Sequence, residues 1–275
     1  MRQWSKNFLV LAAPMATGEI TQAKVLINCM FGFAAFSLLS SCVYIFNDFR
    51  DRSSDRLHPE KRFRPIASQA VSVSEAFLLA FLLLCVVIII TRLLPASSSV
   101  VLVIYFTSNI LYSLGLKTVK YLEIFLLASG FILRAVYGSV ITGLEPSLLF
   151  IFCILCGASF VAFEKRRIEK LKMRSNASES RAVLSKYSEH LLRRGVSYFG
   201  TLFVLTYFLW STFQIQEDSI LGVLKIFSTA PLAVSVWRFH LVSISKLEDA
   251  PEKTILSDRV ILLSVCLWAV LIFPF

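Results

Sequence analysis

The stretch "YIFNDFRDRSSDRLHPEKRFRPIAS", residues 44–68, joins one of the most apolar parts of the chain to a densely charged segment. Residues 25–46 contain no Asp, Glu, Lys or Arg. At about 1.5 Å per helical residue, a run of this length crosses roughly 30 Å of hydrocarbon. The abrupt change from apolar to charged residues predicts a membrane-spanning helix whose end continues into the water at the interface.

The rest of the chain repeats the apolar signal. The mean hydropathy is +0.71, and the 275 residues include 24 Phe, which is more than a soluble core of this size needs. The predicted spans are residues 25–46, 72–91, 97–115, 119–142, 146–163, 195–213, 220–243 and 257–275, with a ninth, weaker run at 7–20. We therefore expect an all-α polytopic membrane protein, with residues 1–275 forming a single membrane domain.

The basic residues predict the orientation of these spans. If nine spans start inside, the cytoplasmic segments and adjoining helix ends hold 23 of the 28 Lys and Arg residues. The net charge of +10 is then concentrated where anionic head groups and phosphorylated substrates meet the protein. This distribution argues against a nucleic-acid-binding protein, in which the positive charge would follow a phosphate backbone.

Three acidic residues follow the first strong span. Asp48, Asp51 and Asp55 are spaced three and four apart, so a helix places them within about 60° of one another on one face. Carboxylates this close repel one another and favour a bound cation, and oxygen ligands select a hard ion such as Mg²⁺. The alternative is a solvated helix end on which the intervening arginines act as salt-bridge partners.

Basic residues follow the acids in "HPEKRFRP". Pro59 and Pro65 predict that the helix has ended and that the chain forms a constrained loop. Lys61, Arg62 and Arg64 would then lie close to the acids, where they could bind phosphate oxygens. The same residues also fit a positive-inside cluster, and the two roles are compatible.

A second group of polar residues lies in "YSLGLKTVKYLEIFLLASGFILRAVYG", residues 112–138. Glu123 and Arg134 are eleven residues apart, which puts Arg134 about 16 Å deeper along a helix. A charge at that depth is either functional or part of a buried ion pair. Lys117 lies at the predicted cytoplasmic end, as a phosphate ligand or as a topogenic charge.

These segments resemble the UbiA superfamily of intramembrane prenyltransferases. "NDFRDRSSD" is similar to its NDxxDxxxD motif, and "RQWSKN", "DRLHPEKRFRPIAS", "FEKRRIEKL" and "WRFH…APEKTILSD" resemble the decaprenyl-phosphate phosphoribosyltransferase branch. The resemblance implies a UbiA-like bundle of nine transmembrane helices around a cytoplasm-facing cavity in the bacterial inner membrane. It also implies Mg²⁺-dependent transfer of phosphoribose from phosphoribosyl pyrophosphate to a polyprenyl monophosphate lipid.

The resemblance also implies roles for individual residues. Asp48, Asp51 and Asp55 would be the catalytic, metal-binding acids that neutralise the leaving diphosphate. Asn47 would be a neutral ligand or ribose contact. The remaining substrate contacts would be Lys61, Arg62, Arg64, Lys117, Glu123, Arg134, Lys165, Arg166 and Tyr187. Lys165 and Arg166 also fit ordinary positive-inside charges.

Two other functions stay open from the sequence. A UbiA-type aromatic prenyltransferase would use the same acids to ionise a prenyl diphosphate, although an aromatic acceptor would not require so many basic residues. A transporter or lipid-binding membrane protein would be expected to carry charges near the midplane of several helices. The sequence does not indicate the isoprenoid length or the oligomeric state.

Overall fold

The computed structural model describes residues 2–57, 61–175, 183–213, 220–248 and 250–272. These residues form helices and connecting turns, with no strand among them, which confirms the all-helical prediction. The chain divides into two compact units. The first comprises residues 1–126 and 133–146, and the second comprises residues 127–132 and 147–275.

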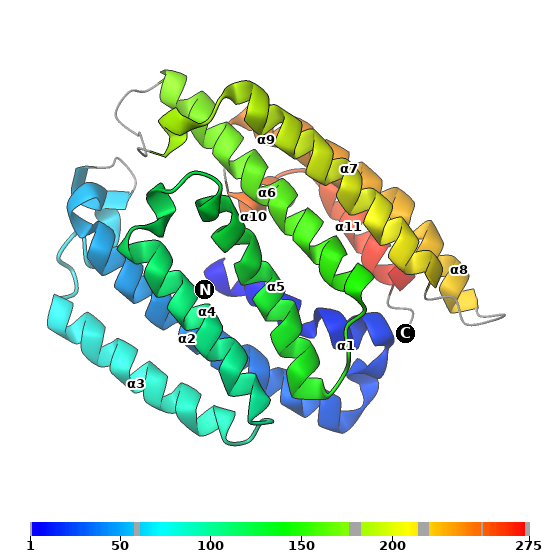
Figure 1. Ribbon diagram of the computed structural model, residues 1–275, viewed down its shortest axis with the longest axis horizontal. Coiled ribbons are helices and arrows are strands. Elements are labelled where there is room, and N and C mark those ends of the chain that lie inside the picture. The colour runs from blue at the N-terminus through cyan, green and yellow to red at the C-terminus, as the bar shows by residue number, and fades with distance from the viewer. Residues whose placement is uncertain (1, 58–60, 176–182, 214–219, 249, 273–275) are drawn as a thin grey trace. The chain divides into compact units, whose positions relative to one another are not determined.

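The first unit is organised around one long helix. Its elements are η1 (Arg2–Leu11), α1 (Ala12–Thr17), η2 (Glu19–Thr21), α2 (Ala23–Leu57), η3 (Lys61–Phe63), α3 (Val73–Thr91), α4 (Ser97–Leu114), η4 (Leu116–Thr118) and most of α5 (Leu122–Thr142). Helix α2 packs against α3 and α4 (Figure 1). With 35 residues it is about 52 Å long, so it exceeds a hydrocarbon core of roughly 30 Å and one end must project from it.

The second unit is built on a pair of long helices. Its elements are α6 (Leu148–Ser175), η6 (Leu184–Lys186), α7 (Glu189–Phe213), α8 (Ile220–Phe227), α9 (Thr229–Lys246), α10 (Pro251–Leu256) and α11 (Arg259–Ile272). Helix α6 runs along α7, and α9 packs against both α7 and α11 (Figure 1).

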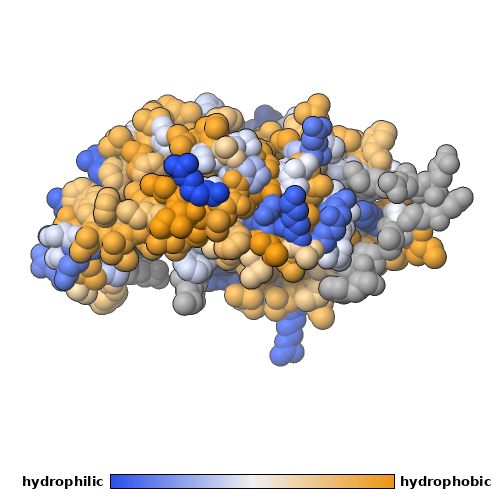
Figure 2. Space-filling model, turned by 90° about the horizontal axis from the view of Figure 1, so that it is seen from below, coloured by the Kyte–Doolittle hydropathy of each residue, from blue (hydrophilic) through white to orange (hydrophobic). Residues whose placement is uncertain are grey.

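Among the described residues, six helices, α2 to α7, are long and apolar enough to cross a membrane, and α11 is a shorter apolar helix. Apolar side chains cover much of the face in Figure 2. The span predicted at 220–243 consists of two helices, α8 and α9, which meet at Ser228. Pro231 has no N–H to donate to the preceding turn, which accounts for the interruption.

Local signals explain where several helices start and stop. Helix α3 begins at a capping box in which the Glu75 N–H donates to Ser72 Oγ (3.2 Å) and the Ser72 N–H donates to Glu75 Oε2 (2.8 Å). Helix α5 ends at Gly143, whose φ of 74° is left-handed and whose N–H donates to the Ser139 carbonyl. These caps lie at the boundaries that the apolar runs predict.

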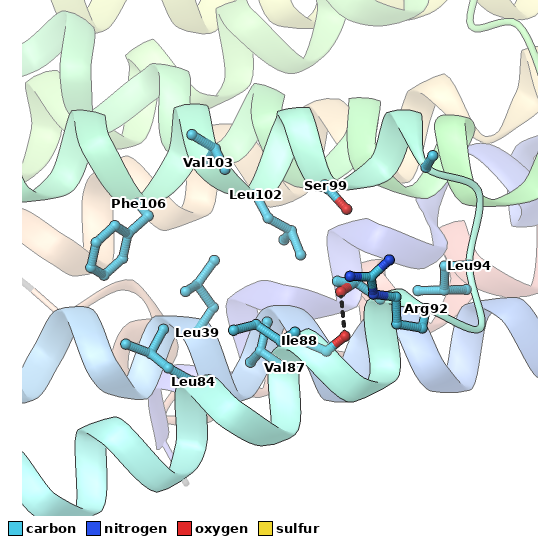
Figure 3. A pocket seen from close by; sticks show the side chains of 12 residues that line it. Leu39, Leu84, Val87, Ile88, Arg92, Leu94, Ser99, Leu102, Val103 and Phe106 are labelled. Carbon is cyan, nitrogen blue, oxygen red and sulfur yellow. Dashed lines mark hydrogen bonds between the residues drawn. The ribbon is translucent and has the colours of Figure 1, made fainter.

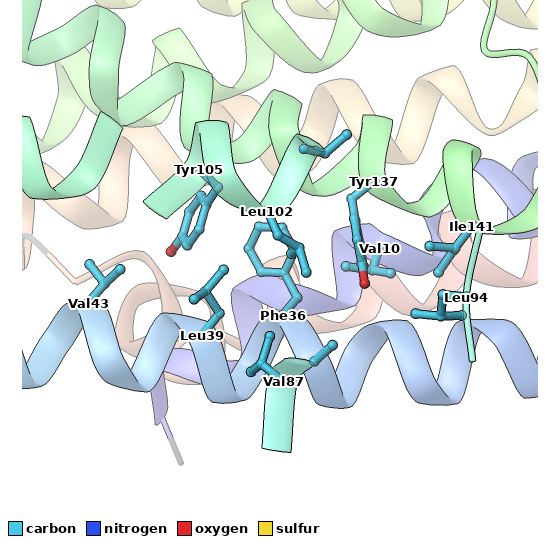
Figure 4. Packing of buried hydrophobic residues seen from close by; sticks show 12 residues of the cluster. Val10, Phe36, Leu39, Val43, Val87, Leu94, Leu102, Tyr105, Tyr137 and Ile141 are labelled. Atoms are coloured by element: carbon cyan, nitrogen blue, oxygen red, sulfur yellow. The ribbon is translucent and has the colours of Figure 1, made fainter. Parts of the chain in front are cut away.

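Aromatic residues fill the core of the first unit. The Phe36 ring on α2 lies 4.5 Å from the Tyr105 ring on α4 and 5.4 Å from the Tyr137 ring on α5, measured between centroids. Leu39, Leu102 and other buried aliphatic residues surround them (Figure 4). This packing joins the middle of α2 to its neighbours and so holds the helix that carries the acids.

The second unit has a core of its own. Phe160 on α6 packs against Phe239 on α9, with ring centroids 5.8 Å apart. Near the division between α8 and α9, the Tyr207 hydroxyl lies 2.6 Å from Ser228 Oγ and accepts a hydrogen bond from Trp268 Nε1 (2.9 Å). The polar groups at the interruption are thus paired within the unit.

Candidate active site

The three predicted acids lie near the C-terminal end of α2, which stays helical to Leu57 as the sequence predicts. The side chain of Asp48 is 26% exposed and that of Asp55 is 6% exposed. A nearly buried carboxylate needs a positive partner or a hydrogen-bond donor to stay ionised. The end of α2 therefore forms an acidic surface whose two outer members differ in their access to solvent.

Arg64 supplies that partner for two of the acids. Its Nη1 atom donates to Asp48 Oδ1 (2.8 Å) and to Asp55 Oδ2 (2.9 Å), so a single nitrogen joins the two carboxylates. The returning chain is held by Arg56, whose Nε donates to the Ala67 carbonyl (3.1 Å). The loop after α2 thus brings a basic residue back onto the acids, as the sequence predicts.

The other two bases of this loop differ from Arg64. The Arg62 guanidinium carbon lies 4.8 Å from the centroid of the exposed Phe63 ring, a cation–π arrangement. Lys61 begins η3 and is half-buried, and its carbonyl accepts from the Arg64 N–H (2.9 Å). Arg64, one of the three predicted phosphate ligands, forms ion pairs with two of the acids.

The segment between α4 and α5 contributes to the same surface. Lys117 in η4 pairs with Asp51, the middle acid. Asn47 Oδ1 accepts from Ser113 Oγ (3.1 Å), near the end of α4. Residues about 66 positions apart are thus brought together, and Lys117 and Asn47 both lie at the acidic end of α2 as predicted.

The carboxylates fit a divalent cation through two members rather than three. No group of three or more His, Cys, Asp or Glu within the described ranges is arranged to hold a metal ion. Asp48 and Asp55, however, converge on one Arg64 nitrogen, which stands in for a shared cation. Mg²⁺ is commonly held by one or two carboxylates together with substrate phosphates, so this donor set suits it.

Glu123 and Arg134 are both buried on α5, and their separation of eleven positions along the helix excludes a direct contact. Arg134 donates from Nε to Asn7 Oδ1 (2.8 Å) and from Nη2 to the Tyr105 hydroxyl (3.1 Å). Its guanidinium carbon also lies 5.1 Å from the centroids of both the Phe36 and Tyr105 rings. Neutral hydrogen bonds and aromatic rings therefore stabilise this buried charge.

The predicted contacts Lys165, Arg166 and Tyr187 belong to the second unit. Lys165 and Arg166 lie within α6, which continues to Ser175. Arg166 is fully buried and pairs with Glu169 on the next turn of the same helix. Tyr187 is 1% exposed, and its backbone carbonyl accepts from Lys170 Nζ.

The sequence predicts no role for Glu164, His240 or Asn7, which are polar residues with specific partners. His240 Nδ1 lies 3.0 Å from Oε1 of the buried Glu164, and Arg167 Nη1 lies 3.4 Å from His240 Nε2. Asn7, which accepts a hydrogen bond from Arg134, lies within the segment RQWSKN. A histidine in an apolar segment is the signal that could have identified the first of these groups.

Arg238 and Asp258 form a further ion pair, in which Arg238 Nη2 lies 2.9 Å from Asp258 Oδ2. Asp258 Oδ1 also accepts from the N–H groups of Val260 and Ile261, at the start of α11. The hydrogen bonds from Arg238 hold the pKa of Asp258 below its usual value. This pair joins α9 to α11 and explains the terminal motif as a structural link.

Comparison with known proteins places these features in a family context. The model of the UbiA prenyltransferase family matches residues 8–251. A decaprenyl-phosphate phosphoribosyltransferase of Corynebacterium glutamicum is 32% identical over 97% of this chain and 82% of its own length. The protein of the same name from Mycobacterium tuberculosis H37Rv is 32% identical over 97% of this chain and 89% of its own length.

The fold has solved counterparts. A UbiA homologue from Archaeoglobus fulgidus, bound to DMAPP and Mg²⁺, superposes with a TM-score of 0.72 at 14% identity, covering 100% of this chain and 97% of that one. At this identity the likeness concerns the fold alone. It includes both helical units of the chain.

Proposed function

The chain belongs to the UbiA prenyltransferase family, and on that premise we propose that it transfers 5-phosphoribose from phosphoribosyl pyrophosphate to a polyprenyl monophosphate. Relatives of that activity, 32% identical over 97% of the chain, support this assignment. The chain is a membrane-embedded transferase. Its products would be a polyprenyl-phosphoryl-5-phosphoribose and pyrophosphate.

The observation that carries the proposal is the arrangement at the end of α2, where Arg64 bridges Asp48 and Asp55 and Lys117 pairs with Asp51. Binding of a diphosphate with its metal ion would replace the ion pairs between the acids and the bases. The acids would then contact the cation, and the bases would contact the phosphate oxygens. Because Arg64 and Lys117 are already close to the acids, they need only short movements to contact the donor.

Asp48 and Asp55 would hold Mg²⁺, with Asp51 beside them. The ion, when bound, supplies positive charge to the leaving diphosphate. In the transfer, an oxygen of the lipid phosphate forms a bond to C1 of ribose while the bond from C1 to the pyrophosphate oxygen breaks, and that electron pair leaves with pyrophosphate. The lipid phosphate is already ionised, so no general base is required.

We further propose that nine transmembrane helices surround the site and that it faces the cytoplasm of a bacterial inner membrane. The distribution of basic residues supports this orientation. Glu123 and Arg134 would then hold the interior of the first unit, while Lys165 and Arg166 stay predicted contacts for phosphate.

The test uses purified protein in detergent with Mg²⁺, labelled phosphoribosyl pyrophosphate and a polyprenyl monophosphate. We expect label in the extracted lipid, lost on addition of EDTA and absent without the acceptor. No labelled lipid, together with activity on a prenyl diphosphate and an aromatic acid, would refute the proposal and identify an aromatic prenyltransferase instead.

A further inference from the structure

A groove of about 710 Å³ lies within the second unit, and none of the described residues that line it was assigned to phosphoribosyl transfer. Small residues of α7 line part of it, namely Ser197, Gly200 and Thr201. A Cβ atom at Gly200 would meet the Phe160 ring at 3.1 Å, so the missing side chain lets this ring of α6 approach α7 at the floor of the groove. Helix α9 forms the opposite wall.

Most of the groove is apolar. Val204 and Leu205 of α7 and Val236 and Trp237 of α9 line it, and the Trp237 side chain is 63% exposed. A concave surface of this composition, between helices of a membrane protein, suits a hydrocarbon chain.

Cations line the same groove. Arg193 and Arg194 are exposed. Neither guanidinium group forms a hydrogen bond or an ion pair with another described residue. His240 contacts the Glu164 carboxylate through Nδ1 (3.0 Å) and Arg167 Nη1 through Nε2 (3.4 Å). None of the described lining residues is acidic. The two arginines therefore give the groove a net positive charge without an acidic partner in its wall.

A second cavity provides a comparison within the same protein. It occupies about 590 Å³ in the first unit, among α2, α3 and α4, and its lining is mainly aliphatic (Figure 3). Arg92 is its one charged residue among the described lining. Thr91 Oγ1 donates to the Ile88 carbonyl (2.8 Å), so its hydrogen is used within the helix. The groove of the second unit differs from this cavity in having two adjacent arginines, Arg193 and Arg194, in its lining.

We propose that the groove between α7 and α9 binds an anionic phospholipid of the bilayer, with its phosphate on Arg193 and Arg194 and an acyl chain along the apolar wall. The apolar wall favours a lipid over a soluble anion, and the two guanidinium groups favour an anionic over a zwitterionic head group. Both arginines belong to the basic segment 164–194, which is predicted to face the anionic cytoplasmic leaflet. This site is independent of the proposed transferase activity.

The first test measures lipid binding to the detergent-purified full chain by native mass spectrometry, with phosphatidylglycerol and phosphatidylcholine as probes. The wild type should retain phosphatidylglycerol preferentially, and R193A/R194A should bind it about 30-fold more weakly. The matched control is K253A/R259A, which removes two exposed basic residues of the same unit outside the groove and should keep the preference. Equal binding of both lipids by the wild type, or equal losses in the two double variants, would overturn the proposal.

A second variant tests the tail separately. Thr201→Trp fills the groove but leaves both arginines. It should therefore weaken phosphatidylglycerol binding at least tenfold, while the binding of glycerol phosphate stays unchanged. Unchanged lipid binding in this variant would overturn the acyl-chain assignment. Displacement of phosphatidylglycerol by an equimolar polyprenyl phosphate would also overturn the proposal, because it would assign the groove to that lipid. Circular dichroism and size-exclusion chromatography establish that each variant is folded.

Discussion

Replacement of Arg64 by Ala tests the link between the acids and the loop that follows α2. Arg64 joins Asp48 and Asp55 through bonds of 2.8 and 2.9 Å, and its side chain is 35% exposed. The bond to the 6% exposed Asp55 contributes about 2 kcal/mol, and the more exposed bond to Asp48 about 0.5 kcal/mol. We expect Arg64→Ala to lower the free energy of unfolding by roughly 2.5 kcal/mol in EDTA.

The assay is thermal unfolding of the purified protein in detergent, with EDTA or Mg²⁺. At about 2–4 °C per kcal/mol, the Tm of Arg64→Ala should fall by roughly 5–10 °C in EDTA. The matched control is Arg52→Ala on α2. Arg52 donates to the Phe49 carbonyl (2.9 Å), and its guanidinium group stacks on the Phe49 ring rather than pairing with an acid. Its Tm should change by no more than about 2 °C.

Mg²⁺ should restore part of the loss. If the ion binds where the guanidinium nitrogen lies, removal of Arg64 removes its competitor, and Mg²⁺ at ten times its Kd should add about 1.4 kcal/mol, or roughly 4 °C, to the variant. The reasoning is refuted if Arg64→Ala and Arg52→Ala show the same Tm in EDTA, or if Mg²⁺ raises the Tm of both variants equally. In the transfer assay, Arg64→Ala should also raise the KM for the donor.

The remaining predictions concern single residues. Asp51→Asn should lower kcat by at least about 100-fold while the protein elutes as a folded species, since the change removes the charge beside the metal-binding pair but little volume; retained activity would exclude an electrostatic role for Asp51 in the transfer. Gly138→Ala should lower Tm because its Cβ would collide with the Val10 carbonyl, and an unchanged melting curve would contradict this packing. His240→Phe should destabilise the protein by about 2 kcal/mol, because it leaves Glu164 without its 3.0 Å partner, and Glu164→Gln should relieve part of that loss in the double variant.

The acidic surface shows which features of the site the local sequence predicts and which it does not. Asp48, Asp51 and Asp55 could be placed on one helical face because their spacing follows the helical period. Their separate partners could not be predicted, since Arg62 and Arg64 are chemically equal and only the turn after η3 determines which of them reaches the acids. The pairing of Lys117 with Asp51 likewise depends on how α4 packs beside α2.

For the buried Arg134, the sequence likewise predicts the position but not the partners. Its depth followed from its position in an apolar run, but its partners Asn7 and Tyr105 are 127 and 29 residues away along the chain. No periodicity within α5 relates these residues.

The sequence by itself determined the class of protein, the approximate spans and the residue types available at the end of α2, because hydropathy and helical period are properties of neighbouring residues. Only the tertiary structure decided that one Arg64 nitrogen joins two acids, that Asn7 and Tyr105 hold Arg134, and that a groove with two arginines lies between α7 and α9. The physical reason is that a side chain's partners depend on which helices pack together, and packing brings together residues far apart in the chain.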